Sequence, residues 1–324
     1  MRVIKNSSQI SAFRHKYSNF ILWMHFRARK LSVTRIRSNF ARLIMLRLLL
    51  LPLLLLQFTT VDRLFRDAKY SECEQALQQM LPQASPGKES AEVFWRLSRV
   101  NLLLGDAAPE VKTKREFYAM GLGYAERAIE EDPSNPEGYM WHSGNIGRDC
   151  NTRSLPEQAK ASVKVSRDLG IILNRLGKVN HSSAWHAMAE YYWRHPFKSS
   201  DSAINFARRS VATIPADEMR LVSCLMLADM LQERNWSAEK RAAEAASNAE
   251  KFKIGKTNTD KYAFYDGSSP RLPWLNGSLT RMSDREEAAA VIRYAKARYD
   301  SCTDVPPAER AEYNNLLKWI KQNL

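Results

Sequence analysis

The stretch Y-A-E-R-A-I-E-E-D-P-S-N-P, residues 124–136, decides the fold class of this chain. Ala125 and Ala128 are three residues apart, so they share one helical face and allow a neighbouring helix to approach closely. Pro133 cannot continue a helix, so the pattern predicts a helix that stops just before it. Asn135-Pro136 then turns the chain toward a new helix. The stretch therefore predicts two packed helices joined by a short turn.

The same two-helix pattern recurs along the chain. Helical periodicity dominates after residue 62, and no sustained alternation argues for a sheet. We expect a helical pair over 61–81, then a first helix over 91–104 ended by Gly105, followed by an insertion over 107–117. The third unit starts at Pro136, and its second helix runs from the capping box S-L-P-E (154–157) to about Leu176. A fourth unit lies around Trp185 and Ala203, and a fifth runs from Met219 through an Ala-rich helix over 237–252.

These repeat phases resemble the tetratricopeptide repeat (TPR) superfamily, whose helical pairs stack into a solenoid used for binding. We predict an all-α fold, a right-handed α-solenoid of four to five TPR-like helical pairs with a C-terminal capping helix. The expected segments are a basic leader (1–44) that could lie upstream of the true start, a signal peptide or signal-anchor (45–61), TPR-like helical repeats (62–252), an aromatic-rich irregular loop packed as a cap (253–281), and C-terminal helices capping the solenoid (282–324).

A narrower resemblance comes from three blocks. They are G-Y-M-W-H-S (138–143), A-K-A-S-V-K-V (159–165) and H-S-S-A-W-H-A-M-A-E-Y-Y-W (181–193). Together with the spacing from Trp141 to Trp185, they resemble the regulator of microtubule dynamics family, which carries an irregular TPR array. The resemblance covers roughly residues 62–215 and implies a binding role, often at membranes.

The N-terminus is basic and ends in an apolar block. Residues 1–61 contain 11 Lys/Arg and no Asp or Glu, and residues 48–56 read L-L-L-L-P-L-L-L-L. This block has signal-peptide length and is shorter than the ~20 residues of a membrane-spanning helix. We expect an exported, periplasmic or membrane-anchored protein, with a mitochondrial transit peptide or a cytosolic N-terminus as alternatives.

Charge and motifs limit the function classes. From Asp62 onward the chain holds 38 basic and 35 acidic residues, so its body is nearly neutral and nucleic-acid binding is disfavoured. The nucleophile elbow, the phosphate-binding loop and the dinucleotide fingerprint are all missing from the sequence. We therefore predict no enzymatic activity and no cofactor. Cys73 and Cys224 fall at apolar-periodic positions and are expected to be buried, whereas Cys150 and Cys302 lie near predicted loops.

In a stacked array, the first helix of each pair lines the concave groove. On the repeat alignment, the side chains that face this groove are Trp95, Arg99, Met140, Arg148, His186, Glu190, Trp193, Arg194, Asp229 and Gln232. Aromatic and Arg side chains are the usual anchors of a binding surface. Arg99, Arg148 and Arg194 together could clamp a carboxylate of a partner.

The histidines allow a different interpretation. His186 and Glu190 lie four residues apart on one helical face and could hold zinc in a metal-dependent enzyme, although no third ligand is apparent. The favoured hypothesis is a non-enzymatic scaffold that binds a protein or peptide in its groove, exported or membrane-anchored. The alternative is an intracellular or organelle-surface regulator resembling the microtubule dynamics family.

Overall fold

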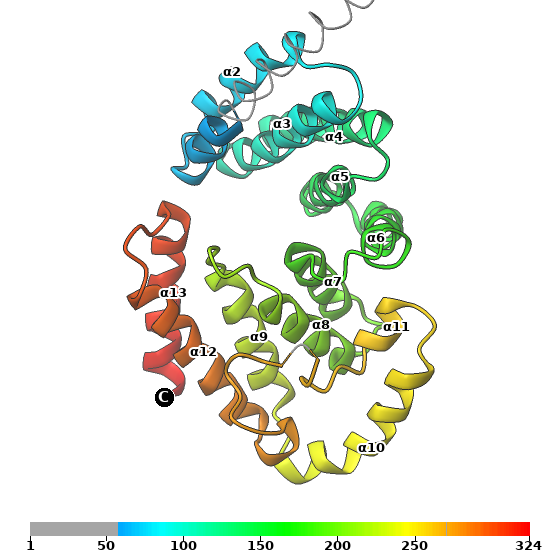
Figure 1. Cartoon of the computed structure of the whole chain (residues 1–324), viewed down its shortest axis with the longest axis vertical. Helices are drawn as coiled ribbons and strands as arrows, with labels where there is room; N and C mark the ends of the chain where they lie inside the picture. Colours follow the sequence, from blue (N-terminus) through cyan, green and yellow to red (C-terminus); the bar gives the residue numbers. More distant parts are fainter. Residues whose placement is uncertain (1–57, 270) are drawn as a thin grey trace, which may run out of the picture. The chain divides into compact units, whose positions relative to one another are not determined.

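The computed structural model describes residues 58–269 and 271–324, and the fold is all-α, as predicted (Figure 1). Residues 58–66 are helical, and residues Val61–Leu324 form one compact unit. The only β-pairing among the described residues is an isolated bridge between Ser268 and Arg271. The elements after residue 66 are α2 (Tyr70–Met80), η1 (Leu81–Gln83), α3 (Lys88–Ala107), α4 (Val111–Glu131), α5 (Pro136–Cys150), α6 (Leu155–Gly170), η2 (Ile171–Arg175), α7 (Ser182–Arg194), α8 (Ser200–Ala212), α9 (Leu221–Arg234), α10 (Ala238–Ile254), α11 (Asn258–Tyr262), η3 (Leu279–Arg281), α12 (Asp284–Asp300) and α13 (Pro307–Asn323).

The turn between α4 and α5 has the predicted form. α4 ends at Glu131, two residues before Pro133, and the Asn135 side chain accepts a hydrogen bond from the Glu137 amide at 2.9 Å. This bond satisfies one of the amides that the first turn of a helix leaves unpaired. Gly138 follows, and a Cβ there would lie 3.0 Å from Ile129 Cγ1. The glycine therefore lets α5 begin in close contact with the end of α4.

Helices that follow one another in the chain pack against one another. Contacts join α2 to α3, α3 to α4, and so on to the pair α8 and α9 (Figure 1). A core cluster lies over α5 to α9, α12 and α13, and in it Trp185 is fully buried and stacked on Phe206 at 5.5 Å. The Trp185 indole N–H is also satisfied, because it donates to the Val179 carbonyl at 2.8 Å. The helical pair expected around Trp185 and Ala203 is therefore confirmed as α7 and α8.

The insertion expected over 107–117 is mostly helical. α3 continues past Gly105 to Ala107, and α4 starts at Val111, so only a short link separates them. A Cβ at Gly105 would meet Tyr118 Cε1 at 2.5 Å, and the Tyr118 hydroxyl donates to Asp106 at 2.8 Å. The expectation that Gly105 ends the first helix was wrong, because this glycine serves close packing against α4.

The long second helix of the third unit has the expected extent and an unexpected last turn. The Glu157 carboxylate accepts from the Ser154 amide at 3.1 Å, which confirms the capping box. After Gly170 the helix widens into a π turn, η2, where the Leu176 amide donates to the Ile171 carbonyl at 2.8 Å. The wider turn presents the Leu173 carbonyl to the Asn258 side-chain amide at 2.6 Å. The segment that contains α11 is thereby attached to η2.

The fifth pair differs from the prediction. α9 was expected to pair with the Ala-rich helix, but α9 packs against α8, α12 and α13, whereas α10 contacts η3 and α11. The physical reason is the composition of the two candidates. α10 buries only Arg241, whereas α12 buries an apolar stripe that includes Val291 and Ile292. An Ala-rich helix without such a stripe gains little from packing, so α12 takes its place.

The aromatic-rich segment after α10 is packed, but it is not irregular throughout, because it contains α11 and η3. Tyr265, Leu272, Leu275 and Leu279 form a small buried cluster, with Trp274 beside it. After this segment, Ser283 caps α12 by accepting from the Glu286 amide at 3.3 Å, which confirms the second predicted capping box.

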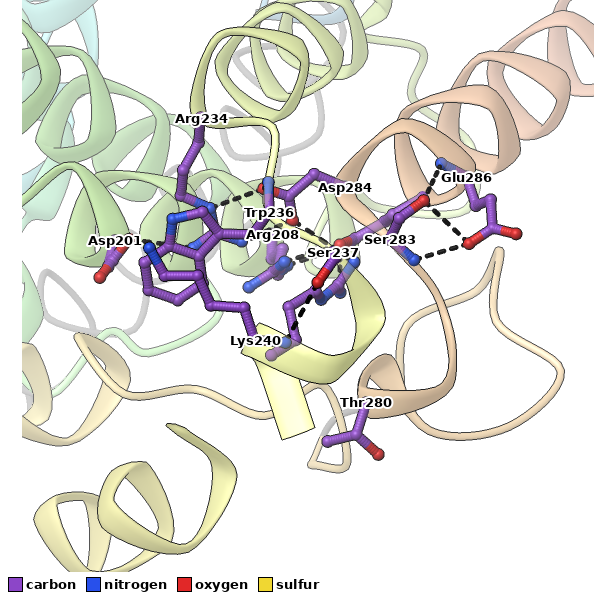
Figure 2. A network of polar contacts seen from close by, with 12 residues as sticks. Asp201, Arg208, Arg234, Trp236, Ser237, Lys240, Thr280, Ser283, Asp284 and Glu286 are labelled. Carbon is purple, nitrogen blue, oxygen red and sulfur yellow. Dashed lines mark hydrogen bonds and ion pairs between the residues drawn. The ribbon is translucent and has the colours of Figure 1, made fainter. Parts of the chain in front are cut away.

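A buried network of ion pairs joins α8, α9, α10 and α12, and Figure 2 shows its Arg208, Arg234 and Asp284 side chains close together. The Asp284 and Glu287 side chains are fully buried. Arg234 binds both Asp284 oxygens, at 2.8 and 2.7 Å. Arg208 binds both Glu287 oxygens, at 2.9 and 2.6 Å, and Arg241 adds a third bond to Glu287 at 2.7 Å. The network therefore fastens the N-terminal part of α10 to α12 even though α10 buries little apolar surface.

The leader 1–44 and the apolar block 48–56 lie outside the described residues. Among residues 58–269 and 271–324, no helix combines the length and the apolar character needed to cross a bilayer.

Candidate functional site

The candidate site lies on α3, α5, α7 and α9, the first helices of the predicted pairs. It is the face of each of these helices that points away from the second helix of its pair. At α3 this face is covered by the chain itself. Asp62, in the helical residues before α2, accepts from Arg96 at 3.0 and 2.8 Å and from Arg99 at 2.9 Å. The Arg99 guanidinium also lies over the Phe65 ring, 3.6 Å from its centre. Residues 61–66 therefore occupy the part of the groove that Arg99 was expected to offer to a partner.

In this covered part, the positive charges of Arg96 and Arg99 are paired with the Asp62 carboxylate. Burial raises the pKa of the Asp62 carboxyl, but the hydrogen bonds and charges of Arg96 and Arg99 outweigh burial and leave the pKa below its ordinary value. Trp95 is buried beside them and donates its indole N–H to Glu92 at 3.0 Å. The Arg96 guanidinium lies 4.1 Å from the centre of the Trp95 ring. Trp95 and Arg99 are thus held inside an intramolecular cluster.

The face of α5 is open. Glu137, Trp141, Gly144 and Arg148 recur at intervals of four, three and four residues, so they lie on one side of the helix. The Trp141 indole N–H donates to Glu137 at 3.0 Å, and Arg148 reaches Asp106 on α3 at 3.1 Å. Trp141 is half-buried, and the Arg148 side chain is 46% exposed. An aromatic ring and a guanidinium are therefore both accessible on one side of this helix, about two turns apart.

Glu137 connects α5 to α7. Its carboxylate accepts from His181, the N-cap residue of α7, with 3.0 Å between the oxygen and Nε2. Burial raises the pKa of the Glu137 carboxyl, but the hydrogen bonds from His181 and Trp141 bring it below the ordinary value. The carboxylate therefore stays ionised and fixes the orientation of the Trp141 ring.

The face of α7 carries the second part of this surface, with His186 and Glu190 half-buried and Arg194 exposed. His186 Nδ1 lies 3.0 Å from the Ser223 hydroxyl on α9, and burial lowers the pKa of His186. Glu190 pairs with Arg194 at 2.7 Å, one turn further along the helix. In the part of the chain that the structure describes, no group of three or more His, Cys, Asp or Glu side chains is arranged to hold a metal ion.

The face of α9 is covered again, this time by α13. The Trp319 indole N–H donates to Asp229 at 2.9 Å, across 90 residues of sequence. Burial raises the pKa of the Asp229 carboxyl, and this hydrogen bond only partly offsets the effect. The chain thus covers the first-helix face at α3 and α9 and leaves it open between them, over α5 and α7.

The predicted groove residues divide accordingly. Three arginines expected to clamp a partner each pair with a carboxylate of this chain, as Arg99 with Asp62, Arg148 with Asp106 and Arg194 with Glu190. Met140 is buried in the core, Trp193 packs half-buried against the same core, and Gln232 is half-buried on α9. The groove as a binding site stays a prediction, and its exposed part is the surface of α5 and α7.

Two residues of this open surface were missed by the sequence analysis. Trp141 was used only for the resemblance to a family, and Glu137 was not considered. The signal was present in the sequence, because Glu137, Trp141 and Arg148 follow helical spacing next to a run of buried residues.

Comparison with protein families found a match for one part of this chain. Residues 57–188 match the sequence model described as regulator of microtubule dynamics protein 1-3. The match runs from the helical residues before α2 into α7, includes the open face of α5, and spans fewer than half of the 324 residues. It supports the resemblance that residues 138–143 and 181–193 suggested. No curated protein sequence matched the chain.

Proposed function

We propose that this chain is a non-enzymatic helical scaffold that binds a protein partner, as an intracellular regulator of the microtubule dynamics type. The observation that carries the proposal is the open α5–α7 surface, where half-buried Trp141 and half-exposed Arg148 lie between two parts of the face that the chain itself covers. Tryptophan and arginine are the side chains most enriched in binding hot spots. The family match to residues 57–188 supports the regulatory role.

The fixed geometry of this surface favours binding. Trp141 is held by Glu137, and Glu137 by His181, so the indole ring has little side-chain freedom to lose when a partner binds. Arg148 is held by one bond to Asp106, which leaves other guanidinium N–H groups available to a partner. The export interpretation depends on residues 48–56, which lie outside the described part of the chain.

Co-sedimentation with purified microtubules tests the proposal. The wild-type chain is expected to sediment with microtubules, and the Trp141→Ala and Arg148→Ala variants are expected to bind at least about tenfold more weakly. Arg127→Ala is the matched control, because Arg127 is also an exposed, ion-paired arginine but lies on the second helix α4.

Absence of wild-type sedimentation would contradict the microtubule assignment. Equal binding by all three variants would contradict the α5–α7 assignment instead. Circular dichroism of each variant confirms that a loss of binding does not come from unfolding.

A further inference from the structure

A cavity of about 310 Å³ lies outside the α5–α7 surface, between the end of α7, the start of α8, the C-terminal end of α10 and α11. Tyr192 and Phe264 give it aromatic walls, and Ile254 lies at its edge with 73% of its surface exposed. An isoleucine this exposed beside an aromatic cavity is apolar surface that could be covered by a partner.

The same cavity is positively charged. Lys251 and Lys256 line it, and Lys198 lies over the Tyr192 ring, 5.1 Å from its centre. Within the described residues, no carboxylate forms an ion pair with any of these three lysines.

The carboxylates closest in sequence are engaged elsewhere. Glu250 pairs with Lys253 at 2.8 Å. Asp260 lines the cavity but accepts from the Thr257 amide at 3.0 Å, in the capping box of α11. The cavity therefore combines apolar walls with two lysines against one carboxylate, Asp260, so its lining carries a net positive charge.

We propose that this cavity binds an acidic peptide segment through one aromatic or aliphatic anchor side chain. The volume lies at the small end of ligand sites and suits one or two side chains rather than a two-chain lipid. Carboxylates that flank the anchor would pair with Lys251 and Lys256, which lack a carboxylate partner among the described residues. The site is separate from the α5–α7 surface, so it can fail or succeed independently of the proposed function.

Fluorescence anisotropy with a fluorescein-labelled Glu-Glu-Phe-Glu-Glu peptide tests this site on the full chain. The Lys251→Gln/Lys256→Gln double variant is expected to bind at least about tenfold more weakly than wild type. The Lys160→Gln/Lys164→Gln double variant on α6 removes the same charge from a distant exposed helix, so its affinity is expected to match wild type. A Glu-Glu-Gly-Glu-Glu peptide is expected to bind about tenfold more weakly, because it lacks the anchor.

Four results would overturn the proposal. Equal losses in the two double variants would show a general charge effect, and equal binding of the Phe and Gly peptides would show that no anchor is read. Loss of peptide binding in Trp141→Ala would place the peptide on the α5–α7 surface. Binding of phosphatidylserine–phosphatidylcholine vesicles that requires Lys251 and Lys256, without binding of the Phe peptide, would assign the patch to a membrane surface.

Discussion

Replacement of Glu287 by Gln removes one negative charge from the buried network that joins α8, α10 and α12. In the native chain this carboxylate accepts two hydrogen bonds from Arg208 and one from Arg241, and it is fully buried. Gln keeps one carbonyl oxygen, so it can replace only part of these bonds and none of the charge. Arg208 would lose the one carboxylate that it pairs with among the described residues, whereas Arg241 would keep Asp284 at 3.4 Å.

The expected loss follows from this geometry. Removal of one partner of a buried ion pair costs about 3–5 kcal/mol, because the remaining charge stays buried without compensation. We expect about 3 kcal/mol for Glu287→Gln, since the amide still accepts a hydrogen bond. The Glu190→Gln variant is the control, because Glu190 pairs with Arg194 on the surface, where the side chains are 36% and 66% exposed. A surface pair of this kind contributes about 0–1 kcal/mol.

Urea unfolding followed by circular dichroism at about pH 7 measures both free energies. A Glu287→Gln loss no larger than the Glu190→Gln loss would refute the reasoning. The pH dependence gives a second check. Burial raises the pKa of Glu287, but Arg208 and Arg241 outweigh burial and bring it below the ordinary 4.5. A carboxylate with a lowered folded-state pKa stabilises the fold above its unfolded value and loses this effect as pH falls. The difference between wild type and Glu287→Gln is therefore expected to be constant above about pH 5 and to shrink below 4.5.

Three further predictions concern single side chains. Asp62→Asn removes the carboxylate shared by Arg96 and Arg99. We expect it to lower the free energy of unfolding in urea by about 1–2 kcal/mol, a value kept small because the Asp62 side chain is 40% exposed. An unchanged midpoint would show that the Asp62 carboxylate does not hold residues 61–66 in place. Burial lowers the pKa of His186, so its NMR titration midpoint is expected below 6.5. The contribution of the neutral ring to stability is present above pH 6.5 and is lost as the pH falls. A midpoint above 6.5 would contradict the burial of the ring. Burial raises the pKa of the Cys224 thiol to about 12, so this thiol stays protonated at about pH 8. N-ethylmaleimide at that pH is expected to modify half-exposed Cys302 and not Cys224, and mass spectrometry measures both. Equal labelling of the two cysteines in the folded chain would be inconsistent with the burial of Cys224.

Local signals in the sequence predicted several helix ends. Pro133 stops α4, Ser154 and Ser283 begin α6 and α12 through capping boxes, and the apolar spacing around Trp185 places that residue in the core. These features depend on residues within one or two turns of each other, so a single chain is enough to recognise them.

The candidate site was only partly predictable. The repeat alignment assigned the groove to α3, α5, α7 and α9, which stays a prediction, and on α5 it selected buried Met140 rather than half-buried Trp141. The sequence also could not show that Asp62 and Trp319 cover two parts of the predicted groove. Both contacts join segments that are far apart in the chain, 37 residues for Asp62 and Arg99 and 90 residues for Asp229 and Trp319.

The sequence by itself determined that this protein is all-helical, where several helices begin and end, and that Trp185 lies in the core, because short-range periodicity, proline and capping residues act locally. Only the tertiary structure decided that α9 pairs with α12 rather than α10, and that α5 and α7 keep an open face. The reason is that these outcomes depend on competition between distant segments for the same surface. α12 packs against α9 in place of α10 because α12 buries Val291 and Ile292. It also carries Glu287, whose carboxylate pairs with Arg208, 79 residues earlier in the chain.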